Sequence, residues 1–277
     1  LAVNDGSSDN NFDSLSDQTV TAATADPWGF TVVESSSSTA VNESGSTDSF
    51  TVVLDAQPSS NVVIDVSSGD TGEATVSAGS LTFTNSNWNS AQTITVTGVD
   101  DNIIDGSINT TVTLTVNDGS SNNNYDPLAD QTVTVATADN DSAGFTKSKT
   151  NVSVVESGTT DTFTVVLDAQ PNSNVVISVT SDDTDEATVD KASLTFTTGN
   201  WNSAQTVTVT GVADNAVDGN QTGTDITLAV NDGSSDNNFD SLSDQNVDVT
   251  TNDPWGFTVV ESSSSTAVNE SGSTDSF

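Results

Sequence analysis

The nine residues FTVVLDAQP stand at Phe50–Pro58 and stand again, unchanged, at Phe163–Pro171, 113 residues further along the chain. In each copy Phe, Val and Leu alternate with Thr, Val and Asp, and a period of two is typical of a strand with one buried face. The Asp-Ala-Gln-Pro that follows has the residues of a turn. The same strand and turn are therefore encoded twice, which predicts two copies of one fold.

The repetition extends over the rest of the chain. WNSAQT recurs at the same offset from Trp88 to Trp201, and LAVNDGSSDNNFDSLSDQ at 1–18 returns unchanged at 228–245. Such self-similarity indicates tandem units. We expect the C-terminal part of a preceding repeat at 1–26, repeat A at 27–141, repeat B at 142–253 and the N-terminal part of a following repeat A at 254–277. Because the end of the sequence restates its beginning, we also expect the native polypeptide to continue past both ends.

Each repeat consists of short alternating runs rich in Val, Ile and Thr, separated by Gly, Pro, Asn and Asp. Seven or eight such strands in about 113 residues, with no helical stretch between them, predict an antiparallel sandwich. The expected fold class is all-β, with tandem antiparallel β-sandwich repeats in an elongated array. Acidic, polar composition is also typical of disordered tails. The regular alternation and the Trp in each repeat favour the folded alternative.

The composition excludes several function classes. The chain of 277 residues has 3 Lys and Arg against 40 Asp and Glu, a net charge of −37, and no His or Cys. That charge argues against binding nucleic acid or an anionic membrane. Without imidazole or thiol groups, any metal must be held by oxygen. No base accompanies a nucleophile and no G-x-S-x-G motif occurs, so we expect no enzyme. Apolar runs are too short for a membrane helix, so we expect no membrane insertion.

Two motifs carry a family resemblance. Repeat B reads VVESGTTDTFTVVLDAQP from Val154, and repeat A reads VNESGSTDSFTVVLDAQP from Val41, followed by TVTGVDDNIIDG from Thr95. These stretches resemble the Calx-β and related immunoglobulin-like repeats of large bacterial surface proteins. The resemblance implies a seven-stranded sandwich that binds Ca²⁺ through loops at one tip, near the junction with the next repeat. It also implies a secreted or cell-surface protein.

The resemblance further implies a set of calcium ligands. In repeat A they are Glu43, Asp70, Asp100, Asp101, Asp105, Asp139 and Asp141, and in repeat B they are Glu156, Asp183, Asp214, Asp218 and Asp253. Ala213 replaces the first carboxylate of the acidic pair in repeat B. With Thr251 and Asn252, repeat B also has fewer acidic residues in its closing segment. We therefore expect repeat B to bind fewer ions, or to bind them more weakly.

Ligand chemistry supports a cation without requiring one. Calcium takes about six to eight oxygen ligands, and clustered carboxylates repel one another unless a cation or a proton compensates. The alternative is that these loops are solvated turns whose charge keeps the protein soluble. A second amide-rich stretch, Asn117–Asp126, is expected to be a hydrogen-bonded turn connection. Trp88 and Trp201 are expected to cover the end of a core, with stacking on a sugar as the alternative.

These observations favour a structural function. We expect a spacer of an extracellular fibre, stalk or adhesin, built of calcium-stiffened repeats, with a glycan-binding module of a surface adhesin as the alternative. The expected partners are the neighbouring repeats of the same chain. Identical chains in a filament and glycans remain open as further partners, whereas nucleic acid is not expected.

Overall fold

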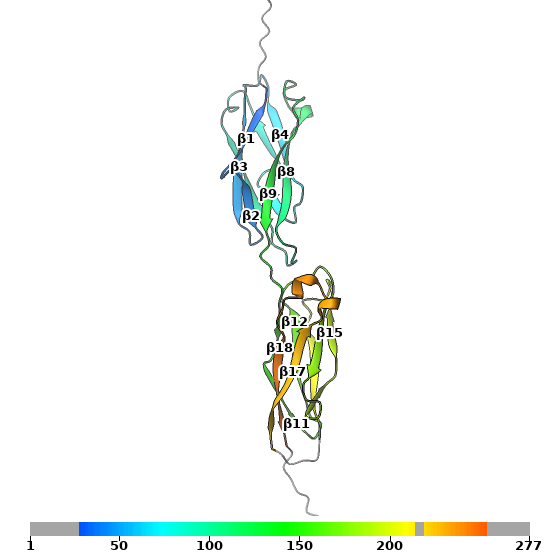
Figure 1. Cartoon of the computed structure of the whole chain (residues 1–277). Helices are drawn as coiled ribbons and strands as arrows, with labels where there is room; N and C mark the ends of the chain where they lie inside the picture. The colour runs from blue at the N-terminus through cyan, green and yellow to red at the C-terminus, as the bar shows by residue number, and fades with distance from the viewer. Residues whose placement is uncertain (1–27, 214–218, 254–277) are drawn as a thin grey trace, which may run out of the picture. The chain divides into compact units, whose positions relative to one another are not determined.

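The computed structural model describes residues 28–213 and 219–253. This part of the chain forms two compact units, each with one four-stranded and one five-stranded sheet (Figure 1). The predicted all-β sandwich fold is confirmed. The expected partial repeats at 1–26 and 254–277 lie outside the described residues. No helix in the described ranges is long and apolar enough to cross a membrane.

The first unit contains nine strands. They are β1 (Phe30–Glu34), β2 (Thr39–Asn42), β3 (Thr47–Leu54), β4 (Val62–Ser68), β5 (Ala74–Val76), β6 (Ser80–Phe83), β7 (Gln92–Gly98), β8 (Ile108–Val116) and β9 (Gln131–Ala138). The strand orders are β1-β3-β7-β5 in one sheet and β2-β9-β8-β4-β6 in the other.

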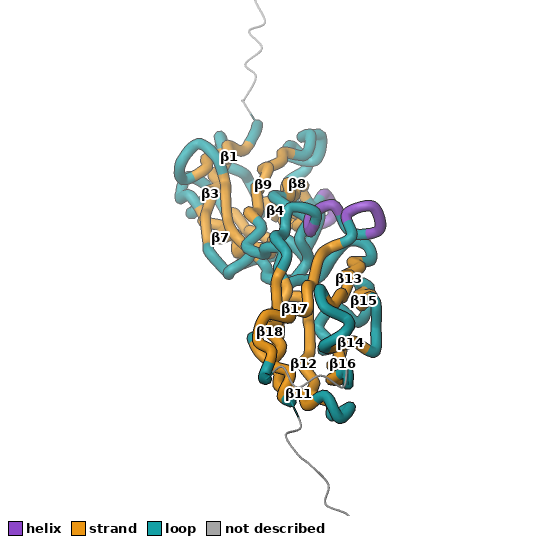
Figure 2. Tube along the Cα trace, turned by 60° about the horizontal axis from the view of Figure 1, so that its bottom comes forward, coloured by secondary structure: helices purple, strands orange, loops and turns teal. Residues whose placement is uncertain are grey.

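The second unit repeats this arrangement. Its strands are β10 (Phe145–Lys147), β11 (Asn151–Val155), β12 (Thr160–Leu167), β13 (Val175–Ser181), β14 (Ala187–Val189), β15 (Ser193–Phe196), β16 (Gln205–Gly211), β17 (Gln221–Val230) and β18 (Gln245–Asn252). The sheets have the orders β10-β12-β16-β14 and β11-β18-β17-β13-β15. Short 3-10 helices at Asp118–Ser120, Asp232–Ser234 and Asn237–Phe239 lie in the connections between strands (Figure 2).

The strand count and the pairing differ from the expected seven or eight antiparallel strands. In the first unit, the opening segment contributes to both sheets because it is interrupted at Ser35–Ser38, where Ser37 has a φ of 67°. Before the interruption β1 pairs antiparallel with β3, and after it β2 pairs parallel with β9. In the second unit β11 likewise pairs parallel with β18. Each sandwich therefore has one parallel pair, between its second strand and its last.

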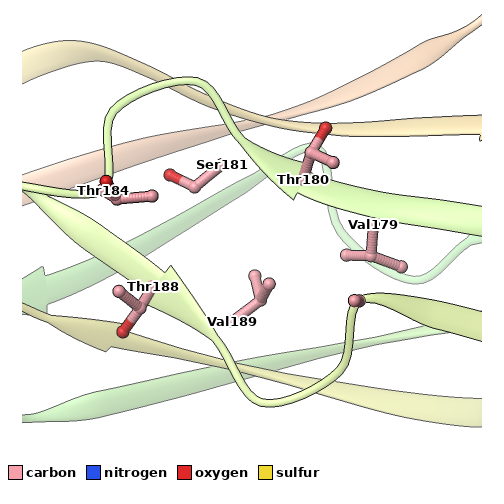
Figure 3. A pocket seen from close by; sticks show the side chains of 7 residues that line it. Val179, Thr180, Ser181, Thr184, Thr188 and Val189 are labelled. Carbon is pink, nitrogen blue, oxygen red and sulfur yellow. The ribbon is translucent and has the colours of Figure 1, made fainter.

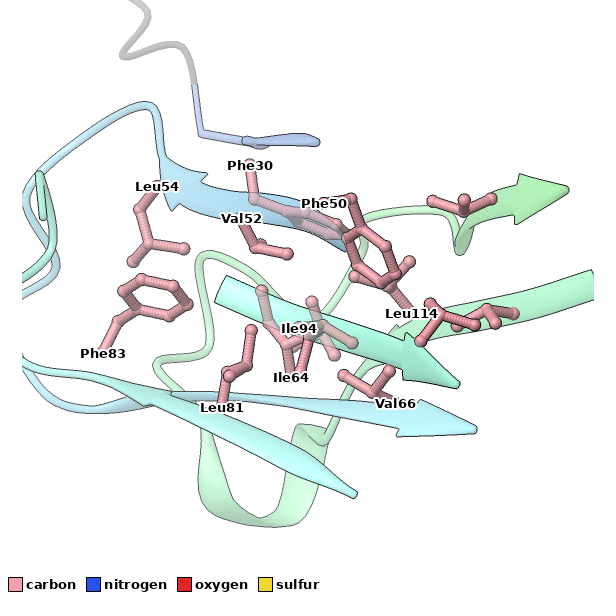
Figure 4. Packing of buried hydrophobic residues seen from close by; sticks show 14 of the residues in the cluster. Phe30, Phe50, Val52, Leu54, Ile64, Val66, Leu81, Phe83, Ile94 and Leu114 are labelled. Carbon is pink, nitrogen blue, oxygen red and sulfur yellow. The ribbon is translucent and has the colours of Figure 1, made fainter. Parts of the chain in front are cut away.

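The core of each unit lies between its two sheets. In the first unit Phe50, Phe83 and Ile94 are fully enclosed (Figure 4), and Phe163 and Phe196 are enclosed in the second. Buried residues alternate with outward Thr, Ser and Val along β3 and β7, as the period of two predicted. Trp88 packs partly buried against the first core and Trp201 against the second. Both therefore cover a core, as expected.

A glycine ends the third strand of each four-stranded sheet and allows a close backbone approach. A Cβ atom on Gly98 would lie 2.0 Å from the carbonyl oxygen of Asn42, and one on Gly211 would lie 2.4 Å from that of Val155. Only glycine fits at these positions. The ends of β2 and β11 are thereby brought against the strands that lead into the acidic loops.

Candidate metal centre

The parallel pairing of β2 with β9 brings two acidic segments together. The C-terminal ends of two parallel strands lie at the same end of the sheet. Glu43, directly after β2, therefore lies beside the residues that follow β9. The backbone N–H of Glu43 donates to the carbonyl oxygen of Ala138 at 3.1 Å. Gly98 N–H donates to Ser46 O at 3.0 Å, which places the beginning of the β7–β8 loop at the same end of the sandwich.

Two groups of three carboxylates form there. Glu43, Asp101 and Asp141 offer oxygen atoms that all lie within 4.8 Å of one another, and so do Glu73, Asp101 and Asp105. Asp101 belongs to both groups. Glu43 is 1 % exposed and Glu73 is 7 % exposed, so two of the five carboxylates are largely removed from water. Negative charges at this spacing and burial repel one another strongly, and a divalent cation would relieve that repulsion.

Local hydrogen bonds hold the loops in shape. Asp101 Oδ1 accepts from the N–H of Ile103 at 2.7 Å. Asp139 Oδ2 accepts from Gly106 N–H at 2.8 Å, and its Oδ1 accepts from Asp141 N–H at 2.6 Å. Gly106 has a φ of 76°, a conformation that glycine adopts without strain. Asp139 therefore ties the β7–β8 loop to the segment that follows β9.

The electrostatic effect of the cluster is visible in Asp105. Partial removal of its carboxyl group from water raises its pKa, and the negative charges of Asp101 and Asp139 raise it further. A raised carboxyl pKa means that the charged form is disfavoured at this place. A bound cation would have the opposite effect and favour the ionised carboxylate.

The structure distributes the expected ligands of repeat A unevenly. Glu43, Asp101, Asp105 and Asp141 are in the two carboxylate groups, whereas Asp70, Asp100 and Asp139 are in neither. Asp70 Oδ1 instead accepts from Gly72 N–H at 2.9 Å within its own turn.

Glu73 was not among the expected ligands. It directly precedes β5, and its carbonyl oxygen accepts from Val99 N–H at 2.9 Å, next to the acidic pair. A sequence signal exists, because both repeats have Glu-Ala-Thr-Val at this point, as Glu73–Val76 and Glu186–Val189. The repeated Glu before Ala-Thr-Val could have marked Glu73 as a candidate ligand.

The second unit retains part of the arrangement. Glu156 and Asp253 are buried, and Glu156 N–H donates to Asn252 O at 3.2 Å, as Glu43 does to Ala138. Asp253 Oδ2 accepts from Gly219 N–H at 2.6 Å, which repeats the contact of Asp139 with Gly106. Asp183 Oδ1 accepts from Asp185 N–H within its own turn. The expected ligands Asp214 and Asp218 lie outside the described residues.

The amide-rich stretch Asn117–Asp126 forms hydrogen-bonded turns. Asn117 Nδ2 donates to Asp65 Oδ2 at 2.9 Å, and Asn122 Nδ2 donates to Ser59 Oγ at 2.7 Å. The Tyr125 hydroxyl donates to Ala56 O at 2.6 Å. These bonds fasten the connection between β8 and β9 to β4 and to the connection between β3 and β4.

An open pocket of about 290 Å³ lies on the second unit (Figure 3). It is lined by Val179, Thr180, Ser181, Thr184, Thr188, Val189 and Ala192. The lining contains no ionisable side chain, so the pocket offers no charged group that would fix a ligand.

Comparison with known proteins gives a fold likeness only. No family model and no curated protein matches the chain. Among solved structures, the calcium binding domain CBD12 of CALX1.1 is 14 % identical over 72 % of this chain and 78 % of that chain, with a TM-score of 0.31. Domains 4 and 5 of the S-layer protein SbsC are 18 % identical over 81 % of this chain and 97 % of theirs, with a TM-score of 0.32. Likeness at this level carries no functional argument.

Proposed function

We propose that this chain is part of a structural spacer, an extracellular fibre, stalk or adhesin shaft of tandem β-sandwich repeats that bind Ca²⁺ at one end of a repeat. The observation that carries the proposal is the pair of carboxylate groups that share Asp101. Extracellular modules bind calcium at about 10⁻⁴–10⁻³ M, so a secreted or cell-surface location supplies enough of the ion.

The donor set suits calcium better than a transition metal. All five side chains of the two groups are carboxylates, and the chain has no His or Cys to add nitrogen or sulfur. Hard oxygen donors favour Ca²⁺ or Mg²⁺, and calcium tolerates the irregular geometry of loops. Glu43, Glu73, Asp101, Asp105 and Asp141 would hold the ion or ions, with Asp139 positioning the loop.

Calcium would couple the site to the chain direction. Asp139 and Asp141 directly follow β9, where the chain leaves the first sandwich. An ion shared by Asp141, Asp101 and Glu43 would fix this exit segment to the loops. Without the ion the carboxylates repel, and the exit segment up to Asp141 would be freed, whereas Gly144 O still accepts from Asp168 N–H at 2.9 Å.

Calcium titration of the purified chain tests the site. We expect the unfolding midpoint of the first unit to rise between chelator and millimolar calcium, since a ligand that binds the folded state stabilises it. Asp101→Asn should remove most of that rise because Asp101 belongs to both groups. Asp70→Asn, the same chemical change outside the groups, is the matched control. Equal midpoints in chelator and calcium would favour solvated acidic turns.

Small-angle scattering tests the mechanical part. A recombinant array of several A–B pairs should be more extended with calcium than with chelator. Asp139→Asn combined with Asp141→Asn should give the compact form even in calcium. If the wild-type profiles are identical in both conditions while calcium still binds, the ion does not stiffen the array.

A further inference from the structure

The first strand of each unit lies at an edge of its four-stranded sheet, and the two edges differ in sequence. β1 reads Phe-Thr-Val-Val-Glu over Phe30–Glu34, whereas β10 reads Phe-Thr-Lys over Phe145–Lys147 and is followed by Ser148 and Lys149. Aligned on the phenylalanine, Val32 corresponds to Lys147. The first unit therefore has a five-residue edge strand without a cation, and the second has a three-residue edge strand with Lys147 in it and Lys149 just after it.

The backbone of β1 has hydrogen-bonding groups on its open side. Ser35 N–H donates to Ser49 O, and Asp55 N–H donates to Gly29 O, so the odd-numbered residues face β3. In an antiparallel strand the alternate residues then point the other way. Phe30 O accepts from Gln131 Nε2 at 2.5 Å. Val32 is the next residue on that side, and within the described residues β1 pairs with no strand other than β3.

The side chains around this edge suit another copy of the same chain. A chain with a net charge of −37 repels its own copies, so contact requires an uncharged surface. Thr31 and Val33 of β1 face outward next to Thr51 and Val53 of β3, and none of the four is charged. Val33 is 54 % exposed, and among the described residues it is the one large hydrophobic side chain that is exposed.

The edge of the second unit has the features that prevent strand addition. Lys147 Nζ donates to the carbonyl oxygen of Asn246, and Lys149 Nζ lies 2.5 Å from Asp161 Oδ1. These are two of the 3 cations in the whole chain. Lysines on an edge strand are a common protection against pairing with another sheet. The first unit lacks this protection at the same strand.

We propose that β1 of the first unit is a self-association edge, which pairs antiparallel with β1 of a second copy about a two-fold axis at Val32. The two Val32 residues would exchange backbone N–H···O bonds. Thr31 of each copy would then stand opposite Val33 of the other, so that each exposed valine packs sideways against a threonine of the partner copy. This pairing does not depend on the metal site.

Sedimentation equilibrium of the whole chain over a range of concentrations tests the edge. We expect the mass to rise toward twofold for the wild type and to stay monomeric for Val33→Lys, which adds the charge that the second unit has nearby. Thr82→Lys on β6, an edge strand of the other sheet, makes the same charge change and should still dimerise. A wild type that stays monomeric, or a Val33→Lys variant that dimerises equally, would overturn the proposal.

Cysteine cross-linking tests the register, and the chain has no native cysteine to interfere. Facing residues of a non-hydrogen-bonded antiparallel pair have Cα atoms about 4.5 Å apart, which is within the range of a disulfide. A mixture of Thr31→Cys and Val33→Cys chains should form disulfide-linked dimers several-fold faster than either variant alone. Equal rates in the mixture and in the single variants would contradict the two-fold pairing at Val32.

Discussion

Phe50 and Phe163 occupy the same position in the two sandwiches and are 0 % and 1 % exposed. Their cross-strand partners, Ile94 and Val207, are also equivalent. The margins of the two units differ much more. Trp28 and Tyr125 pack edge to face at one end of the first unit, where the sequence of the second has Ala143 and Phe239. Packing constrains the core, whereas turns and edges are freer to vary.

The largest expected effect concerns the glycine that ends β7 in the first unit and β16 in the second. Gly98→Ala and Gly211→Ala should each lower the free energy of unfolding by about 3 kcal/mol, because the added Cβ would overlap a backbone carbonyl that cannot rotate away. Hydrogen exchange measured on peptides of each unit should show the loss only in the unit that carries the substitution. Gly79→Ala is the control, since its Cβ would meet nothing within 4 Å. A loss of the same size at Gly79 would contradict the explanation by close approach.

The next largest expected effect is a difference between the two units in how much calcium stabilises them. After Asp139 the first repeat continues with Asn140 and Asp141, whereas after Asp253 the second continues with Pro254 and Trp255. The sequence of repeat B thus offers counterparts for Glu73, Asp101 and Asp105, but none for Asp141. With calcium about 100-fold above its Kd, the first unit should gain about 2.7 kcal/mol, and the second less. Equal gains in unit-resolved hydrogen exchange would mean that Asp141 contributes nothing.

A smaller effect is expected at Tyr125, whose counterpart in the second repeat is Phe239. Tyr125→Phe removes the hydrogen bond to Ala56 O and leaves that buried end of the first unit like the second. We expect a loss of about 1 kcal/mol, measured by urea unfolding, because a typical hydrogen bond contributes about that much. Leu128→Ala tests the packing of the same loop separately, since Leu128 packs against the first core without such a bond.

The smallest effect concerns acid stability. The hydrogen bond from Lys149 lowers the pKa of Asp161 below its usual value, while in the first unit the hydrogen bond from Ser35 lowers the pKa of Asp48. A lowered folded-state pKa stabilises the protein above the unfolded pKa, and this contribution is lost as the pH falls through the folded value. Lys149→Gln should raise the pKa of Asp161 and leave that of Asp48 unchanged in an NMR titration. A shift of both would point to a general field effect.

Much of the fold could be predicted from the sequence because buried strands follow a strict period of two. Phe50, Val52 and Leu54 were assigned to one face, and all three are buried. The transfer of the opening segment from one sheet to the other was not predicted, since nothing in Ser35–Ser38 distinguishes a sheet change from a turn. The tertiary structure also decides which carboxylates meet. Asp70 and Glu73 are three residues apart, yet only Glu73 lies beside Asp101.

The parallel pair of β2 and β9 has a consequence under tension. The chain enters the first unit through β1 and β2 and leaves it after β9. A pull on the two ends therefore moves β2 and β9 in opposite directions along a common axis. Hydrogen bonds across the pair are then loaded in shear and share the force, whereas a peeled hairpin breaks its bonds one at a time. Pulling through attachment points at Asn42 and Ala138, which lie side by side at one end of the pair, would peel the same strands apart and should require much less force.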